Sequence, residues 1–149
     1  MKIAFKALVW VVLILAAGGL TNGGWAQKSS AQSISPREFK QLLDKRSDDP
    51  DVVVLDIRTP REFKTGHIRG AQLLDYYSSD FVEKLKRLDR EKTYLVYCRS
   101  GSRSGKSLTI FKRLGFQRVY HLETGIAGWL KEKNPLEHWP CLAGQNACS

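Results

Sequence analysis

The sequence predicts an α/β domain built on a mostly parallel sheet of four or five strands flanked by helices. Short apolar runs alternate along the chain with segments whose apolar residues recur at helical spacing. Two of the runs, Val52–Leu55 and Tyr94–Tyr97, are continuously apolar. A strand buried on both faces carries such residues at every position, so these runs indicate the interior of a parallel sheet.

Residues 1–26 have the pattern of a secretory signal peptide. Lys2 and Lys6 precede an uncharged apolar stretch from Ala7 to Ala17, and Gly24-Trp25-Ala26 offers small residues at the two positions that a signal peptidase requires. The apolar stretch is shorter than the roughly 20 residues of a membrane span. We therefore expect cleavage after residue 26 and no stable membrane insertion afterwards, with an uncleaved anchor as the alternative.

The chain after cleavage, residues 27–149, is long enough for one compact domain and too short for two. Loss of Lys2 and Lys6 lowers the formal charge from +9 to +7, since residues 1–26 contain no acidic residue. This positive excess suits anionic small molecules or a negatively charged cell surface, and in an exported chain it argues against a nucleic-acid role. Residues 27–33 are polar and small and are expected to form a flexible leader.

One signature marks two helix starts. Ser35-Pro36-Arg37-Glu38 and Thr59-Pro60-Arg61-Glu62 each combine a hydroxyl N-cap, Pro at the first helical position and Glu three residues after the cap. The first predicts a helix whose apolar face carries Phe39, Leu42 and Leu43. The second predicts a helix of one or two turns that ends at Gly66.

The remaining elements continue the alternation of strands and helices. A short strand over Ala71–Leu74 is followed by a helix capped by Ser78-Ser79-Asp80. After the strand at Tyr94–Tyr97, a helix begins near Ser104 and ends at Gly115, where a C-cap glycine belongs. A last strand over Val119–Leu122 leads into a helix that opens at Gly125 and stops at Asn134-Pro135.

The stretch that carries chemistry is the loop between the strand at Tyr94–Tyr97 and the following helix. It begins with Cys98 and contains Arg99, Ser100, Gly101, Ser102, Arg103 and Ser104. Backbone amides of such a loop and the positive end of the helix dipole point to one place above the strand. They would favour a thiolate and lower the pKa of a cysteine from about 8.5. Cys98 is therefore predicted to be a thiolate nucleophile for an anionic substrate, and a buried structural cysteine is the alternative.

Three segments, in this order and at these separations, resemble the rhodanese-like sulfurtransferase family over Ile34 to Pro135. The first joins Val54-Leu55-Asp56-Ile57-Arg58 to Glu62-Phe63 and Gly66-His67-Ile68-Arg69-Gly70-Ala71. The second is the Cys98 loop after an apolar strand. The third, Leu122-Glu123-Thr124-Gly125-Ile126-Ala127-Gly128-Trp129, is similar to the family's Gly-Gly-x-x-x-Trp element, with Thr124 in place of its first Gly.

The resemblance implies a single rhodanese-like domain over residues 34–135 of the thiosulfate sulfurtransferase type, and an exported bacterial form implies the periplasm. Cys98 would carry sulfane sulfur as a persulfide, with thiosulfate as donor, cyanide or a thiol as acceptor, and no metal or organic cofactor. Loop amides from Ser100 to Ser104 would stabilise the thiolate and the persulfide, and the serine hydroxyls are further candidate donors to sulfur. Arg99 and Arg103 would hold the oxyanion end of the donor, although Arg103 has an alternative role as a clamp on a neighbouring carboxylate.

Other polar residues have structural interpretations. Asp56 and Arg58 lie at a strand end, where they either orient the active-site loop or, as we favour, form an internal ion pair. His67 follows the predicted helix and is expected to be a hydrogen-bonded structural residue rather than a general base. The three histidines lack the spacing of metal ligands: His67, His121 and His138.

Two rival functions are weighed against sulfur transfer. Cysteine-dependent phosphatases and arsenate reductases use a similar loop, but they need one more residue between cysteine and arginine than the four found here, Arg99 to Ser102. Tyr97 also stands where they usually have His, so the loop is predicted to be too small for phosphate. The other rival is a non-catalytic domain that binds a partner or carries sulfur. The single-domain length permits a monomer or a dimer.

The tail, residues 136–149, lies outside the resemblance and contains Cys141 and Cys148. In an oxidising compartment an even pair at close range predicts a disulfide, which leaves Cys98 as the odd free thiol. A redox-active or resolving role for this pair is the alternative.

Overall fold

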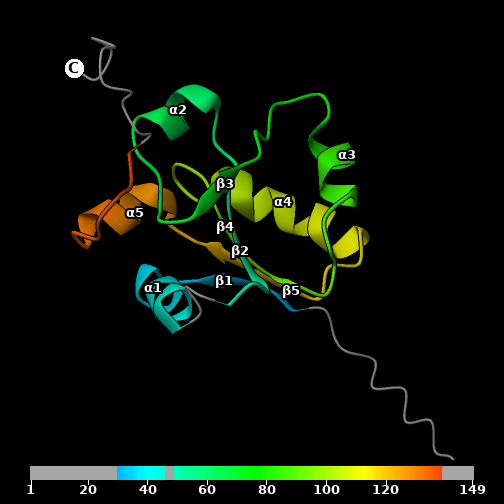
Figure 1. Cartoon of the computed structure of the whole chain (residues 1–149), viewed down its shortest axis with the longest axis horizontal. Helices are drawn as coiled ribbons and strands as arrows, with labels where there is room; N and C mark the ends of the chain where they lie inside the picture. The colour runs from blue at the N-terminus through cyan, green and yellow to red at the C-terminus, as the bar shows by residue number, and fades with distance from the viewer. Residues whose placement is uncertain (1–29, 46–48, 139–149) are drawn as a thin grey trace, which may run out of the picture.

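The computed structural model describes residues 30–45 and 49–138, in which five strands form one sheet with helices on both faces (Figure 1). In chain order the elements are β1 (Ser30–Ile34), α1 (Pro36–Lys45), β2 (Val52–Asp56), α2 (Pro60–Lys64), β3 (Ala71–Leu73), α3 (Phe81–Lys86), β4 (Thr93–Tyr97), α4 (Ser102–Arg113), β5 (Arg118–Leu122) and α5 (Gly125–Lys131). The α/β class and the parallel sheet that the sequence predicts are confirmed.

The order of the strands determines where a site can form. All neighbours pair in parallel, in the order β1-β5-β4-β2-β3. In this order β3 lies next to β2 toward one edge of the sheet, and β5 lies next to β4 toward the other edge. The connections that follow β2 and β4 therefore run toward opposite edges. Ligands of open parallel sheets bind where such connections diverge, beyond the carboxyl ends of the strands. The divergence lies between β2 and β4, and Cys98 is the first residue after β4.

Side chains of β4 alternate between two hydrophobic clusters, one on each face of the sheet. Tyr94 and Val96 pack with buried residues of α3 and α4, including Phe81 and Phe111. On the opposite face, Leu95 and Tyr97 pack with side chains of α1 and α5. Figure 1 shows α3 and α4 on one side of the sheet and α1 on the other. Every residue of β4 is buried, as the continuous apolar run predicts.

Both predicted capping boxes are present. The Thr59 hydroxyl accepts from the amide of Glu62, whose carboxylate accepts from the amide of Thr59 at 3.0 Å. Ser35 and Glu38 make the same reciprocal pair at the start of α1, with the carboxylate accepting from the Ser35 amide at 2.9 Å. Each box supplies partners for backbone donors that a helix start leaves unpaired, and the first turns therefore form where the sequence places them.

The predicted leader over residues 27–33 is wrong in its described part. Residues 30–33 belong to β1, which pairs in parallel with β5 and places Ser33 opposite His121. Polar side chains are tolerated there because β1 is an edge strand held by backbone hydrogen bonds. Just beyond the predicted 34–135 domain, Glu137 pairs with His67 through backbone bonds of 2.7 and 2.8 Å.

Several predictions fall on residues that the structure does not describe. The signal peptide over residues 1–26, the leader residues 27–29, and Cys141 and Cys148 all lie outside the described ranges. Within residues 30–45 and 49–138, no helix is both long and apolar enough to cross a membrane.

Thr124, where the chain departs from the Gly-Gly-x-x-x-Trp element, packs against Gly128. This contact predicts a stability effect. A Cβ on Gly128 would lie 1.8 Å from Thr124 Oγ1 and 2.5 Å from Thr124 Cβ. We expect Gly128→Ala to lower the free energy of unfolding by roughly 1–3 kcal/mol, the usual cost of overpacking. Urea unfolding followed by tryptophan fluorescence measures this change.

Two further variants interpret the result. Adding Thr124→Gly removes the collision, so the double variant should recover most of the lost stability. Gly105→Ala is the control, because a Cβ there meets His121 at an ordinary 3.5 Å. If the Gly128→Ala protein is as stable as the wild type, the predicted collision between the Cβ added at position 128 and the Thr124 side chain does not occur.

Candidate active site

The predicted loop residues lie together at the carboxyl end of β4. The side chain of Cys98 is fully buried, as are Gly101 and Ser104, whereas Arg99, Ser100 and Ser102 are exposed. Ser102 is the first residue of α4, a helix of twelve residues whose N-terminus therefore faces the loop. The positive end of its dipole adds to the field at the cysteine.

Hydrogen-bond donors of the loop converge on the sulfur of Cys98. Burial raises the pKa of this thiol, but the amides of Ser104, Ser100 and Gly101 and the Ser104 hydroxyl outweigh burial and lower it from its ordinary value. The Ser104 Oγ lies 3.6 Å from the sulfur. Hydrogen bonds to the charged form stabilise that form, so the geometry favours a thiolate.

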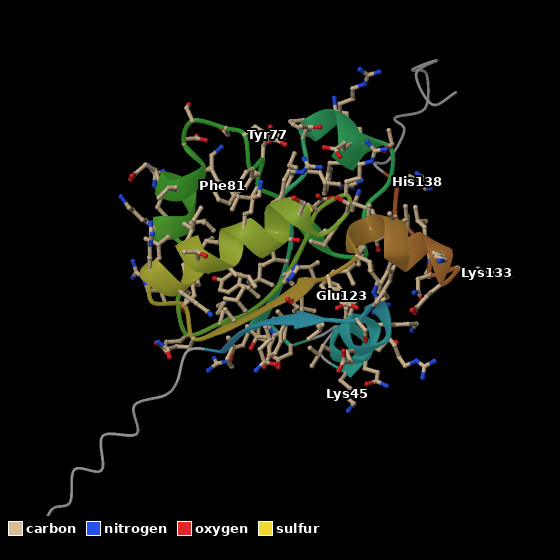
Figure 2. All side chains as sticks on the ribbon, turned by 180° about the vertical axis from the view of Figure 1, so that it is seen from behind. Lys45, Tyr77, Phe81, Glu123, Lys133 and His138 are labelled. Atoms are coloured by element: carbon tan, nitrogen blue, oxygen red, sulfur yellow. The ribbon has the colours of Figure 1, made fainter. Side chains whose placement is uncertain are left out.

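The N-terminus of α5 holds the loop in this shape. The amide of Ile126 donates to the carbonyl of Cys98 at 2.8 Å, and the amide of Ala127 donates to the carbonyl of Arg99 at 3.1 Å. Gly101 has φ = 87°, and a Cβ there would lie 1.7 Å from the carbonyl oxygen of Glu123. Figure 2 shows Glu123 where β5 turns into α5. Only glycine permits this approach of backbone to backbone.

The two loop arginines differ in their surroundings. Arg103 makes a bidentate ion pair with Glu62 of α2, with N–O distances of 2.9 and 2.7 Å. The Arg103 guanidinium is the main reason that the pKa of Glu62 falls to about 2. Arg103 also lies 5.4 Å from the ring centroid of Tyr77. Arg103 therefore has its alternative predicted role, a clamp on a neighbouring carboxylate. Arg99 has no acidic partner among the described residues.

Asp56 and Arg58 form the internal ion pair that the sequence predicts. Both side chains are buried, and the Arg58 Nε and Nη2 donate to the carboxylate at 2.6–2.9 Å. Nη2 also donates to the carbonyl of Gly66 at 2.7 Å, and the guanidinium lies 5.7 Å from the ring centroid of Tyr97. The pair therefore contacts the residue just before Cys98 and the turn that follows α2.

Two side chains that the sequence does not single out are linked to the cysteine through Ser104. The Nδ1 of His121 lies 3.1 Å from Ser104 Oγ, and its Nε2 lies 2.8 Å from Ser33 Oγ. From the sequence, His121 is considered only as a metal ligand and Ser33 only as part of the leader. Their signal was weak, because a histidine on a strand contacts the loop only once the sheet and α4 are assembled.

His67 has the structural role that was expected. Its ring stacks on Phe63 with centroids 4.0 Å apart, and its Nδ1 lies 3.3 Å from the Phe63 carbonyl oxygen. Among the described residues, no group of three or more His, Cys, Asp or Glu side chains is placed to hold a metal ion.

The parallel α/β sheet thus presents Cys98 in an amide-lined loop beyond a central strand. Residues 35–132 match the family model described as the rhodanese-like domain. The chain therefore belongs to the rhodanese-like domain family.

Curated relatives and a solved structure agree with this assignment. A probable adenylyltransferase/sulfurtransferase MoeZ from Mycobacterium tuberculosis is 34% identical over 117 residues, which are 78% of this chain and 29% of that longer protein. A tRNA uridine(34) hydroxylase from Cytophaga hutchinsonii is 36% identical over 102 residues, 66% of this chain and 31% of the relative. The chain thus spans about a third of these relatives.

Shorter proteins align over nearly their whole length. A sulfurtransferase from Allochromatium vinosum is 30% identical over 103 residues, which cover 69% of this chain and 94% of the relative. The crystal structure of a rhodanese-related protein from Thermoplasma volcanium superposes with a TM-score of 0.60 at 30% identity, covering 71% of this chain and 97% of the other.

The ion pair of Glu62 and Arg103 predicts a stability that depends on pH. The folded pKa of Glu62 is about 2, below its ordinary value of 4.5. Its contribution is therefore complete above about pH 4.5 and is lost as the pH falls toward 2. Glu62→Gln should lower the free energy of unfolding by roughly 1–2 kcal/mol at pH 7, and this difference should shrink below pH 4.5.

Urea titrations at several pH values between 7 and 2.5 measure the difference. Glu83→Gln is the matched control, because Glu83 pairs with Lys86 on an exposed surface and should contribute little. A difference for Glu62→Gln that stays constant over this pH range would contradict the role of the carboxylate charge.

Proposed function

We propose that this protein is a sulfurtransferase in which Cys98 accepts sulfane sulfur from thiosulfate or a similar anionic donor and passes it to cyanide or a thiol. The observation that carries the proposal is the convergence of three loop amides and the Ser104 hydroxyl on a cysteine sulfur. Such a cradle suits a sulfur that is negative before and after it takes on a second sulfur atom. The sulfurtransferase relatives support the same chemistry.

The reaction proceeds in two steps that balance without a cofactor. The Cys98 thiolate attacks the outer sulfur of thiosulfate, a new S–S bond forms, and sulfite leaves with the electron pair of the broken bond. Cyanide or a thiolate then attacks the outer sulfur of the persulfide, and the Cys98 thiolate leaves. Free enzyme and persulfide enzyme alternate, so the kinetics are ping-pong.

The loop is poorly suited to the rival phosphatase chemistry. A phosphatase loop wraps a tetrahedral oxyanion and uses its arginine to bind that oxyanion. Here the loop closes after four residues, and both terminal nitrogens of Arg103 bond to Glu62. We therefore assign the first contact with the anionic donor to Arg99, which is exposed and free of an acidic partner in the described structure.

We further propose that the protein works in the periplasm after cleavage at residue 26, with Cys141 and Cys148 joined as a disulfide. The sequence pattern of residues 1–26 and the even pair of tail cysteines support this proposal. An oxidising compartment would leave Cys98, buried in its loop, as the free thiol.

Intact mass spectrometry tests the sulfur transfer directly. Wild type incubated with thiosulfate should gain one sulfur atom, which cyanide removes as thiocyanate, and Cys98→Ser should gain none. Before any donor is added, the same spectrum should show a chain that starts at residue 27 and lacks two hydrogens for the tail disulfide. A wild type that takes up no sulfur from thiosulfate or from a polysulfide would favour the non-catalytic binding module.

Steady-state kinetics and unfolding measurements should distinguish the roles of Arg99 and Arg103. Arg99→Gln should raise the KM for thiosulfate about tenfold with little change in unfolding, because one charge contact of about 1.4 kcal/mol is lost. Arg103→Gln should instead lower stability, because it leaves Glu62 without its partner. If Arg103→Gln raises the KM and Arg99→Gln does not, the assignment of donor binding to Arg99 is wrong.

A further inference from the structure

A hydrogen-bonded row of side chains leads from the surface to the sulfur of Cys98. The exposed Ser33 lies 2.8 Å from Nε2 of His121, whose Nδ1 lies 3.1 Å from Ser104 Oγ. The Ser104 Oγ lies 3.6 Å from Cys98 Sγ. His121 and Ser104 are buried, and the four residues come from β1, β5, α4 and the loop after β4.

The single proton of the Ser104 hydroxyl has three acceptors within reach. They are the sulfur of Cys98, the carbonyl of Gly101 at 3.1 Å, and Nδ1 of His121 if that nitrogen carries no proton. A neutral histidine has one donor nitrogen and one acceptor nitrogen. When Nδ1 carries the proton, it donates to Ser104 Oγ, and the hydroxyl proton cannot be drawn away from the sulfur toward the ring.

The contact of the other ring nitrogen is compatible with this tautomer. With the proton on Nδ1, Nε2 is an acceptor, and the Ser33 hydroxyl of the exposed edge strand can donate to it. Burial lowers the pKa of His121, while the charge of Glu123 works in the opposite direction, so the ring is neutral near pH 7. The charges of Arg103 and Cys98 also interact, and Arg103 is unchanged in every variant below.

We propose that His121 is a positioning residue that, with its proton on Nδ1, donates to Ser104 Oγ and so keeps the hydroxyl proton of Ser104 available to the sulfur of Cys98. The inference rests on the proposed role of Cys98 as a nucleophile. His121 touches neither donor nor acceptor, and its effect reaches the sulfur through Ser104 alone. Ser33 orients the ring from outside, which gives the edge strand β1 a part in the site.

A double-mutant cycle on the thiol pKa tests this coupling. The pKa is measured from the pH dependence of alkylation of Cys98 by iodoacetamide in reduced full-length protein, with the modified residue identified by peptide mass. Ser104→Ala should raise the pKa by about one unit and His121→Phe by about half a unit, which is roughly a threefold loss of thiolate below the pKa. In the Ser104→Ala background, His121→Phe should add no further change.

Two variants separate positioning from mere packing. His121→Asn keeps an N–H donor near the place of Nδ1 and should restore most of the wild-type pKa. His67→Phe is the matched control, because His67 is another buried histidine, but it stacks on Phe63 and bonds to residues outside the Cys98 loop. It should change stability and leave the pKa of Cys98 as it is.

The tautomer itself is read from nitrogen NMR of the wild type, so the proposal stays testable even if His121→Phe folds poorly. The His121 signal, assigned by its loss in His121→Asn, should show a protonated Nδ1. A protonated Nε2, an unchanged thiol pKa in His121→Phe, or an equal shift with and without Ser104 would each overturn the proposal. Alkylation needs no sulfur donor, so failure to form a persulfide would count against sulfur transfer and not against this coupling.

Discussion

The site depends on two hydrogen bonds from the start of α5 to the carbonyls of Cys98 and Arg99. In a trans peptide the C=O and the next N–H point in opposite directions. Binding the Arg99 carbonyl from outside the loop therefore turns the amide of Ser100 inward, where it acts on the sulfur. One of the amides that stabilise the thiolate is thus oriented by α5, a helix that contributes no side chain to the site.

This arrangement requires backbone segments to approach more closely than most residues allow. A Cβ on Gly125 would lie 2.5 Å from the carbonyl oxygen of Cys98, and a Cβ on Gly101 would lie 1.7 Å from the carbonyl oxygen of Glu123. Glycine is therefore required at both positions, because three backbone segments come close together here: the Cys98 loop, the end of β5 and the start of α5. Thr124, where the family has glycine, lies outside this contact and places its side chain over Gly128, which has room for it. The substitution is accommodated along α5 and leaves the loop intact.

The parts of the structure that could be predicted are those with a local cause. The apolar runs identify β2 and β4, capping boxes identify the starts of α1 and α2, and the strand-loop-helix pattern identifies Cys98. The strand β1 could not be predicted, because its polar residues are held by backbone pairing with β5 and carry no apolar signal. The ion-pair partner of Arg103 could not be predicted from the sequence either, because Glu62 is 41 residues away and is one of 15 acidic residues in the chain. His121 belongs to the same class of distant contact.

The two arginines divide the electrostatics of the site between two physical mechanisms. The positive charge of Arg103 is balanced by the negative charge of Glu62. The thiolate is therefore stabilised mainly by fixed backbone dipoles and a hydroxyl within a buried loop. Such dipoles are already oriented and are screened little by salt, because no solvent separates them from the sulfur. Arg99 is exposed, so the attraction for an anionic donor that the proposed function assigns to it should fall as ionic strength rises. Under that proposal, the reactivity of Cys98 and the capture of its donor respond to different changes in solution, although one loop of the chain supplies both.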